Sequence, residues 1–392
     1  MTESDGMMSY EIDIAAAIAQ VAETLAAHPE RRSDLAEEYI LRGETRPYPA
    51  FYMWRAPDID AGEHLTQPLP PATTPEERLL RSLRGMTGSL AMLNPIRPVV
   101  NLGKGTGTLP SSFGIMLDPA LGFTPKGNRP MREVLAEGMP DPETSGIIPD
   151  MRADIEAVQR LTPEWVKIAL PDMQGPFNIA HMILGDEVFF APYEEPEEFA
   201  AFLTMVTDFF IALHGRLQSW IEPARRVAFP QNNCRVAECS VNMVSKDIYL
   251  EHVLPHDQRI ATYYGRIAVH PCSGPHVFSA TLDNLPNVVY TEAGYIEKAF
   301  AGSIRVADAM EALGGRPIIL GIGEELPADW DEAERTVQRY FDYAKTNPRL
   351  TFGFTGMYWK KGTEDQIRAL HLRLDQYWHD NVWAPHAAVV AG

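Results

Sequence analysis

The sequence predicts an α/β protein of the (β/α)8 type, a TIM barrel with an N-terminal helical extension. Along most of the chain, short apolar runs rich in Val, Ile and Ala alternate with amphipathic stretches of helical period. Such alternation is typical of parallel strands joined by right-handed crossovers. About eight of these units follow one another, which favours closure into a barrel over an open sheet. The 392 residues leave room for one barrel and an extension.

The extension is predicted to cover residues 1–92 and to be helical. In YEIDIAAAIAQVAETLAAH the apolar residues recur at helical spacing. The stretch TTPEERLLRSLRGMTGSLAML begins with a capping residue, Thr74, and has Pro at the first helical position. We therefore expect one helix before residue 28 and a second from about residue 74 to residue 92.

The barrel is predicted to cover residues 93–392. Its strand-like runs are IRPVVNLG, WVKIALP, RVAFPQNN, RVAECSV, GRIAVH, NVVYTE, RPIILGIG and LTFGFTG. The helical stretches include GPFNIAHMIL, EEPEEFAAFLTMVTDFFIALHGRLQSWI, DIYLEHVLPHDQRIATYYG, HVFSATLDNLP, YIEKAFAGSIRVADAMEALGG, DWDEAERTVQRYFDYAKTN and EDQIRALHLRLDQYWHDNVW. The segment GKGTGTLPSSFG is predicted to be a loop, and its glycine spacing fits neither a Walker loop nor a dinucleotide motif.

The composition excludes several classes of function. A formal net charge of -19 disfavours a nucleic acid partner. No stretch reaches about 18 consecutive apolar residues, and the acidic start MTESDGMMSYEID is unlike a secretory signal, so we expect a cytoplasmic protein without a membrane span. The three cysteines, Cys234, Cys239 and Cys272, are too few to staple a chain of this size and are interpreted as thiols or ligands.

Polar residues directly after the predicted strands are candidates for chemistry, because active sites of such barrels lie at the carboxyl ends of the strands. His270 and Cys272 follow GRIAV, and Glu292 follows NVVYT. Nitrogen, sulfur and oxygen donors of this kind suit zinc, and residues two apart in an extended chain point to one side. The spacing alone favours the other reading, a buried thiol beside a hydrogen-bonded histidine. The remaining strand-end residues are Asp172, Glu238, Cys239 and Met357.

Several stretches, in this order, resemble the uroporphyrinogen decarboxylase superfamily: PDMQGPFNIAHMILGDEVFFAPYEEPEEF, ECSVNMVSKDIYLEHVLPHDQRI, AVHPCSG and GMYWKKGTEDQIRAL. The superfamily includes corrinoid-dependent methyltransferases and is similar to the C-terminal domain of cobalamin-independent methionine synthase. The resemblance covers roughly residues 40–385 through many weak motifs, and it implies a (β/α)8 barrel.

The methyltransferase branch binds zinc through HxC, often a glutamate on the next strand, and a second cysteine near the last strand. His270, Cys272 and Glu292 match the first three, whereas Met357 stands at the position of the second cysteine. A neutral thioether is a weaker zinc ligand than a thiolate. The resemblance thus implies a zinc-dependent methyltransferase that moves a methyl group to or from a corrinoid or a small acceptor. It also implies a small-molecule substrate and a small corrinoid protein as partner, and the sequence leaves a homodimer open.

The decarboxylase branch uses no metal and carries an N-terminal PxWxMRQAGR segment. The nearest stretch here, RPYPAFYMWRAPDID, keeps Arg46 and Arg55 without QAGR, and nothing matches the FSDIL stretch of that branch. One alternative is therefore a metal-free decarboxylase of a tetrapyrrole or aromatic acid that uses Arg46, Arg55 and Asp172. Another alternative is a barrel that binds a corrinoid or tetrapyrrole without turnover.

The remaining site residues are proposed on two grounds: Arg46 and Arg55 from the resemblance to the decarboxylase segment, and the others from positions near predicted strand ends. Asp172 and Glu238 are the candidate catalytic carboxylates. Arg46, Arg55, Tyr264 and Tyr358 are the candidate substrate-binding residues. Aromatic residues in such places more often pack than bind, and His181 and His276 are interpreted as structural.

Overall fold

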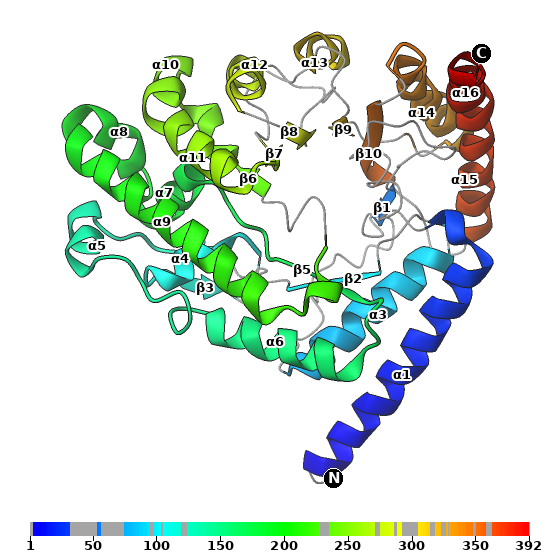
Figure 1. Ribbon diagram of the computed structural model, residues 1–392, viewed down its shortest axis with the longest axis horizontal. Coiled ribbons are helices and arrows are strands. Elements are labelled where there is room, and N and C mark those ends of the chain that lie inside the picture. Colours follow the sequence, from blue (N-terminus) through cyan, green and yellow to red (C-terminus); the bar gives the residue numbers. More distant parts are fainter. Residues whose placement is uncertain are drawn as a thin grey trace. The chain divides into compact units, whose positions relative to one another are not determined.

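The computed structural model describes residues 3–31, 53–55, 74–91, 93, 98–102, 105–118, 124–227, 235–270, 275–285, 288–291, 305–313, 318–322, 327, 329–347, 350–357 and 363–391. The chain divides into two compact units, in both of which helices alternate with strands (Figure 1). Unit 1 comprises Met1–Leu69, Leu80–Pro98 and Val289–Gly392, and unit 2 comprises Pro70–Leu79 and Val99–Val288. The predicted boundary at residue 92 stays a prediction.

Unit 2 carries the strand ends on which the described part of the candidate site depends. Its parallel strand pairs are β2 with β5 and β6 with β7, and β3 and β4 form an antiparallel hairpin. These strands are β2 (Val99–Asn101), β3 (Met116–Asp118), β4 (Thr124–Lys126), β5 (Lys167–Ala169), β6 (Arg235–Ala237) and β7 (Ile267–His270).

The helices of unit 2 pack around a long central helix, α9 (Pro196–Trp220). This helix contacts α5, α7, α8 and α11 and buries its apolar face in the unit (Figure 1). The other helices are α4 (Thr108–Ser112), α5 (Met131–Glu137), α6 (Ile148–Leu161), α7 (Pro176–Leu184), α8 (Glu187–Glu194), α10 (Lys246–Ile248), α11 (Leu254–Tyr264) and α12 (Pro275–Asn284). Short 3-10 turns are η3 (Gly105–Gly107), η5 (Pro223–Arg225) and η6 (Cys239–Met243), and a π-helical turn, η7 (Tyr249–Val253), joins α10 to α11.

By length and composition alone, α9 could also cross a membrane. Its most apolar window has a mean hydropathy of 1.3, and 50% of that window is buried inside the protein. Core helices of soluble proteins can be equally long and apolar, so the length and hydropathy of α9 are weak support for a membrane span.

Unit 1 contains a run of parallel strands in the order β1, β10, β9, β8. Helix α14 packs against both β10 and α15, which is the arrangement expected when helices cover a parallel sheet. The strands are β1 (Met53–Arg55), β8 (Val288–Thr291), β9 (Ile318–Ile322) and β10 (Leu350–Met357). The helices and turns are α1 (Glu3–Ala27), η1 (Pro29–Arg31), α13 (Val306–Leu313), α14 (Trp330–Ala344), α15 (Glu364–Trp378), η8 (His379–Trp383) and α16 (Ala384–Ala391).

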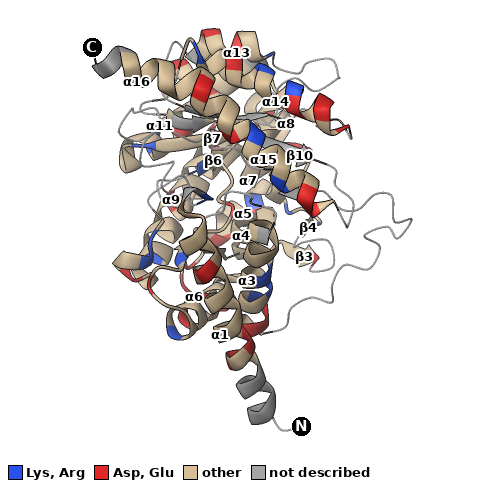
Figure 2. Ribbon diagram, turned by 90° about the vertical axis from the view of Figure 1, so that its right-hand side faces the viewer, with Lys and Arg blue, Asp and Glu red and all other residues tan. Residues whose placement is uncertain are grey.

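Helix α3 (Pro75–Ala91) has residues in both units and begins where the sequence predicts. The Thr74 hydroxyl accepts a hydrogen bond from the backbone N–H of Glu77 at 3.2 Å, which caps the first turn. In α14, Asp329 caps the helix in the same way through the N–H of Glu332 at 2.9 Å. Acidic and basic residues are interspersed along helices such as α3, α6 and α15 (Figure 2).

The parallel pairing confirms the predicted α/β class. The long predicted helices are present where the chain is described, and of YIEKAFAGSIRVADAMEALGG the described helical part is Val306–Leu313. The loop prediction for GKGTGTLPSSFG was wrong, because Gly105–Gly107 and Thr108–Ser112 form helical turns. The predicted strand RVAECSV ends at Ala237, and a 3-10 turn starts at Cys239. The β3–β4 hairpin and helices α5, α6 and α8 were not predicted. Closure of the strands into a barrel stays a prediction.

Candidate functional site

The site begins where β6 and β7 end side by side. The parallel register places Ala237 opposite His270, the last residue of β7. The backbone N–H of Glu238 donates a hydrogen bond to the carbonyl oxygen of His270 at 3.0 Å. Two of the strand-end residues that the sequence singles out therefore lie on adjacent strands of unit 2. The His270 side chain is half-buried at this strand end.

The other two predicted zinc ligands, Cys272 and Glu292, lie outside the described residues. Glu292 directly follows β8, which ends at Thr291. Within the described part of the chain, no three side chains of His, Cys, Asp or Glu form a group that could hold a metal ion. The zinc set of His270, Cys272 and Glu292 therefore stays a prediction.

Glu238 turns its carboxylate into the protein, onto the amino end of α7. Its side chain is buried, and its two oxygens accept hydrogen bonds from Phe177 N at 3.0 Å and Asn178 N at 2.9 Å. The first N–H groups of a helix have no partner within the helix, so a carboxylate there is stabilised by both hydrogen bonds and the helix dipole. Gly175 makes the approach possible, because a Cβ at that position would lie 2.3 Å from Cδ of Glu238.

A second buried carboxyl group, that of Asp257 in α11, lies against Glu238. Burial, and then the neighbouring Asp257 carboxyl, raise the pKa of Glu238 well above its ordinary value, against the effect of the two N–H donors. Burial likewise raises the pKa of Asp257 to about 7. Two carboxylates in one apolar site repel each other, so the pair retains a proton near neutral pH.

Asp257 is held in turn by hydroxyl groups. Tyr249, in the π-helical turn, donates a hydrogen bond to Oδ2 of Asp257 at 3.4 Å. Thr281 of α12 lies with its hydroxyl oxygen 3.0 Å from that of Tyr249. The buried carboxyl pair therefore joins the end of β6 to α7, α11 and α12.

The turn after Glu238 is also bound to α7. Asn178 Oδ1 accepts hydrogen bonds from the backbone N–H of Ser240 at 3.2 Å and from the Ser240 hydroxyl. His181 Nδ1 lies 2.8 Å from the same hydroxyl oxygen, and burial lowers the pKa of His181. Because Ser240 gives its proton to Asn178, His181 is the donor in this pair. The arrangement therefore orients the turn and does not activate Ser240 as a nucleophile.

Cys239 lies between the two anchored residues Glu238 and Ser240. It is a half-buried cysteine at the first residue of η6. The strand prediction put Glu238 and Cys239 on opposite sides unless the backbone bends there. The backbone does bend at Glu238, with φ -111 and ψ 58.

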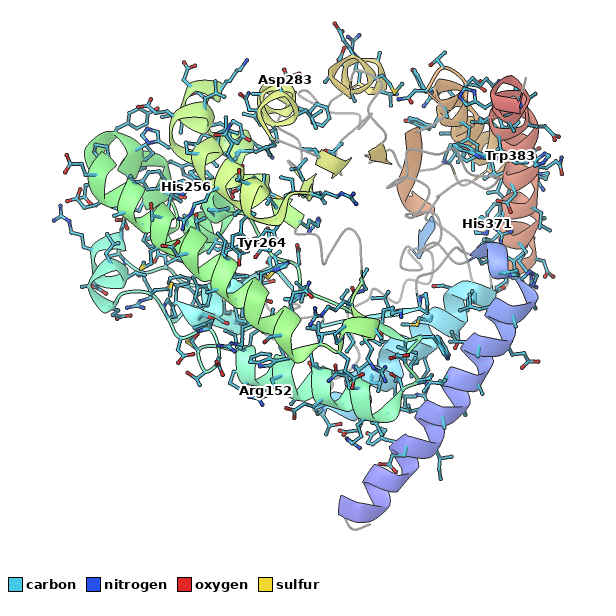
Figure 3. All side chains as sticks on the ribbon, viewed as in Figure 1. Arg152, His256, Tyr264, Asp283, His371 and Trp383 are labelled. Carbon is cyan, nitrogen blue, oxygen red and sulfur yellow. The ribbon has the colours of Figure 1, made fainter. Side chains whose placement is uncertain are left out.

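Asp172 forms an ion pair with Arg235 at the start of β6. Tyr264, labelled in Figure 3, is the last residue of α11, and its ring packs against His214 of α9 at a centroid distance of 4.2 Å. Arg55 lies in β1 and Met357 ends β10, whereas Arg46 and Tyr358 lie outside the described residues. Substrate contacts by Arg46, Arg55, Tyr264 and Tyr358 stay a prediction, as do the catalytic roles of Asp172 and Glu238.

Asp257, Gly175 and Asn178 were not among the predicted site residues. Asp257 had a detectable signal, because it stands on the apolar face of its helix together with the buried residues Val253 and Ile260. A carboxyl group at an apolar-face position is unusual and points to a buried partner. Gly175 and Asn178 carried no comparable signal, because their importance depends on a residue some sixty positions away in the chain.

Comparison with known proteins gives the fold. No protein-family model and no curated protein matches the chain. Among solved structures, a methyltransferase from Methanosarcina mazei matches with a TM-score of 0.61 at 14% identity, over 87% of this chain and 97% of its own. A B12-independent methionine synthase from a Shewanella species, in complex with selenomethionine, matches with a TM-score of 0.37 at 12% identity, over 62% of this chain and 68% of its own.

The TM-score of the methionine synthase match is too low to support an argument, whereas the methyltransferase match extends over nearly the whole of that protein. At 14% identity it establishes the fold and leaves the substrate open. A shared fold with a methyltransferase is what the sequence resemblance implied. The chain thus shares its fold with that methyltransferase, and membership of the uroporphyrinogen decarboxylase superfamily stays a prediction.

Proposed function

We propose that the protein is a methyltransferase that moves a methyl group to or from a corrinoid or a small acceptor at a zinc site. The observation that carries the proposal is the position of His270, at the carboxyl end of β7 and beside the end of β6. In barrels of this class the chemistry lies at such strand ends. The likeness in fold to a solved methyltransferase supports it. The proposal includes closure of the predicted strands into a (β/α)8 barrel.

The proposed ligands are His270, Cys272 and Glu292. The donor set of imidazole, thiolate and carboxylate fits zinc, which in catalytic sites takes three protein ligands and keeps one open position. When bound, zinc lowers the pKa of a thiol or hydroxyl group at the open position and so supplies a nucleophile near neutral pH. His270 would bind the metal through its half-buried ring. The main-chain carbonyl group of His270 is held by the hydrogen bond from the Glu238 N–H.

Met357 distinguishes this chain from the pattern of the methyltransferase branch. A thioether in place of a thiolate leaves the site with one negative charge less. We propose that this difference favours an oxygen substrate, such as water or a phenolic or methoxy group, over a thiol. The small-molecule substrate, the small corrinoid protein as partner and the cytoplasmic location belong to the same proposal.

Metal analysis of the purified protein tests the proposal. We expect about one zinc per chain by plasma mass spectrometry, and loss of that zinc in Cys272→Ser, because thiolate is the strongest of the three proposed donors. Cys239→Ser is the matched control, since it removes a half-buried thiol near the same strand ends and is expected to keep its zinc. Zinc-free protein from preparations without chelator, or equal zinc in Cys272→Ser and Cys239→Ser, would contradict the proposed site.

A further inference from the structure

We propose that Glu238 is a positioning residue for His270, and that it acts through a buried hydrogen-bond network on the amino end of α7. We call Gly175, Asn178, Glu238 and Asp257 the Glu238 network. This inference rests on the proposed function, because it treats His270 as a metal ligand. It assigns Glu238 no direct contact with the metal or the substrate.

Both oxygens of Glu238 accept hydrogen bonds from the amino end of α7. Phe177 N donates to Oε1 at 3.0 Å and Asn178 N donates to Oε2 at 2.9 Å, so the carboxylate is fixed in orientation as well as in place. The side chain is only 4% exposed, so water offers it no alternative partner. This geometry requires Gly175, whose missing side chain leaves the necessary space.

Glu238 is connected to His270 through the main chain at the end of β6. The backbone of β6 is held from both sides at its carboxyl end: Gly175 N donates to Ala237 O at 2.8 Å, and Glu238 N donates to His270 O at 3.0 Å. Displacing the Glu238 side chain would move the Glu238 N–H and so disturb its hydrogen bond to the carbonyl group of His270. The position of the His270 ring relative to any bound metal therefore depends on the Glu238 carboxylate.

The two buried carboxyl groups differ in how well an amide could replace them. An amide at position 238 would turn an NH2 group toward one of the two backbone N–H donors, so donor would face donor. An amide at position 257 has no such conflict, because Oδ2 can still accept from Tyr249 and the new NH2 group can donate to Glu238. Glu238→Gln is therefore expected to disrupt the network, whereas Asp257→Asn is expected to preserve it.

The experiment uses cobalt(II) as the probe in the full chain. Cobalt bound by histidine and cysteine gives visible absorption bands that report the ligand geometry, and competition with zinc gives the zinc affinity. We expect Glu238→Gln and Gly175→Ala to weaken zinc binding about 10- to 100-fold and to shift the cobalt bands, because residues that orient metal ligands contribute on this scale. Asp257→Asn is expected to bind within about twofold of the wild type with unchanged bands.

Thermal unfolding of each variant shows whether it is folded at the temperature of the titration. If Glu238→Gln does not fold, Gly175→Ala is the deciding variant, because it displaces the carboxylate without changing its chemistry. Wild-type affinity and unchanged cobalt bands in a folded Glu238→Gln or Gly175→Ala variant would overturn the positioning role and leave the proposed function intact. Failure of the wild-type protein to bind cobalt or zinc would overturn the proposed function itself, and the positioning role with it.

Discussion

Arg225→Met is expected to destabilise unit 2 by about 4 kcal/mol, because it leaves several buried acceptors without a donor. Arg225 is only 5% exposed and lies in the 3-10 turn after α9. Its guanidinium group binds the last turn of α6 and the residues that lead into β5. The acceptors are Gln159 O, Thr162 O, Thr162 Oγ1, Pro163 O and Val166 O, at 2.7 to 3.3 Å, together with the Glu222 carboxylate at 2.8 Å.

Methionine keeps much of the volume of the arginine side chain but none of its donors. Three of these acceptors are carbonyl groups at or just beyond the end of α6, where no helical N–H is available and a positive charge also favours the helix dipole. Urea unfolding followed by circular dichroism measures the effect as a lower midpoint. Arg226→Met is the control: this neighbouring arginine is exposed, and within the described residues its side chain makes one such bond, to Ile221 O at 3.1 Å, so a loss below about 1 kcal/mol is expected. Equal losses in the two variants would contradict the role of Arg225.

Acidification is expected to destabilise unit 2 through His214. This residue of α9 is 2% exposed, neither ring nitrogen has a hydrogen-bond partner within the described residues, and its ring packs against Phe210 and Tyr264. Burial lowers the pKa of His214 from 6.5 to about 4. Between pH 6.5 and pH 4, His214 is therefore protonated in the unfolded chain but stays neutral in the folded protein. The free energy of unfolding falls as the pH falls through this window.

Between pH 7 and pH 4.5, His214 is expected to cost about 2.5 kcal/mol of stability. Comparing the free energy of unfolding of His214→Phe with that of the wild type at both pH values isolates the contribution of His214, since other groups contribute equally to both proteins. His256, whose pKa burial also lowers to about 4, acts in the same direction, whereas Asp257 acts in the opposite one. We expect the variant to gain stability relative to the wild type at pH 4.5 and to differ by less than about 1 kcal/mol at pH 7. An identical difference at both pH values would show that His214 does not titrate in this range.

The sequence was a good guide wherever a local pattern sets the structure. The cap at Thr74 and the helical period of Pro196–Trp220 were read correctly. So was the strand that ends at His270. In each case the pattern lies within the element that it predicts.

The predictions were poorer where distant residues decide the local structure. The helical turn at Thr108–Ser112 was taken for a loop because the segment is rich in Gly and Ser, whereas one of its contacts, Ile147 N to Ser111 Oγ at 3.2 Å, comes from outside the segment. The strand beginning at Arg235 was extended too far, because the partners that draw Glu238 out of the strand are the N–H groups of α7. The pairing of Glu238 with Asp257 could not be read from the sequence for the same reason.

Gly175 has ordinary extended backbone angles, φ -70 and ψ 162, which any residue can adopt. It is therefore required for the volume that it leaves to Glu238 and not for its flexibility. The two positions should then vary together among related chains. An alanine at position 175 is expected only where position 238 carries a side chain shorter than glutamate. Such paired substitutions would identify the Glu238 network in related proteins from their sequences alone.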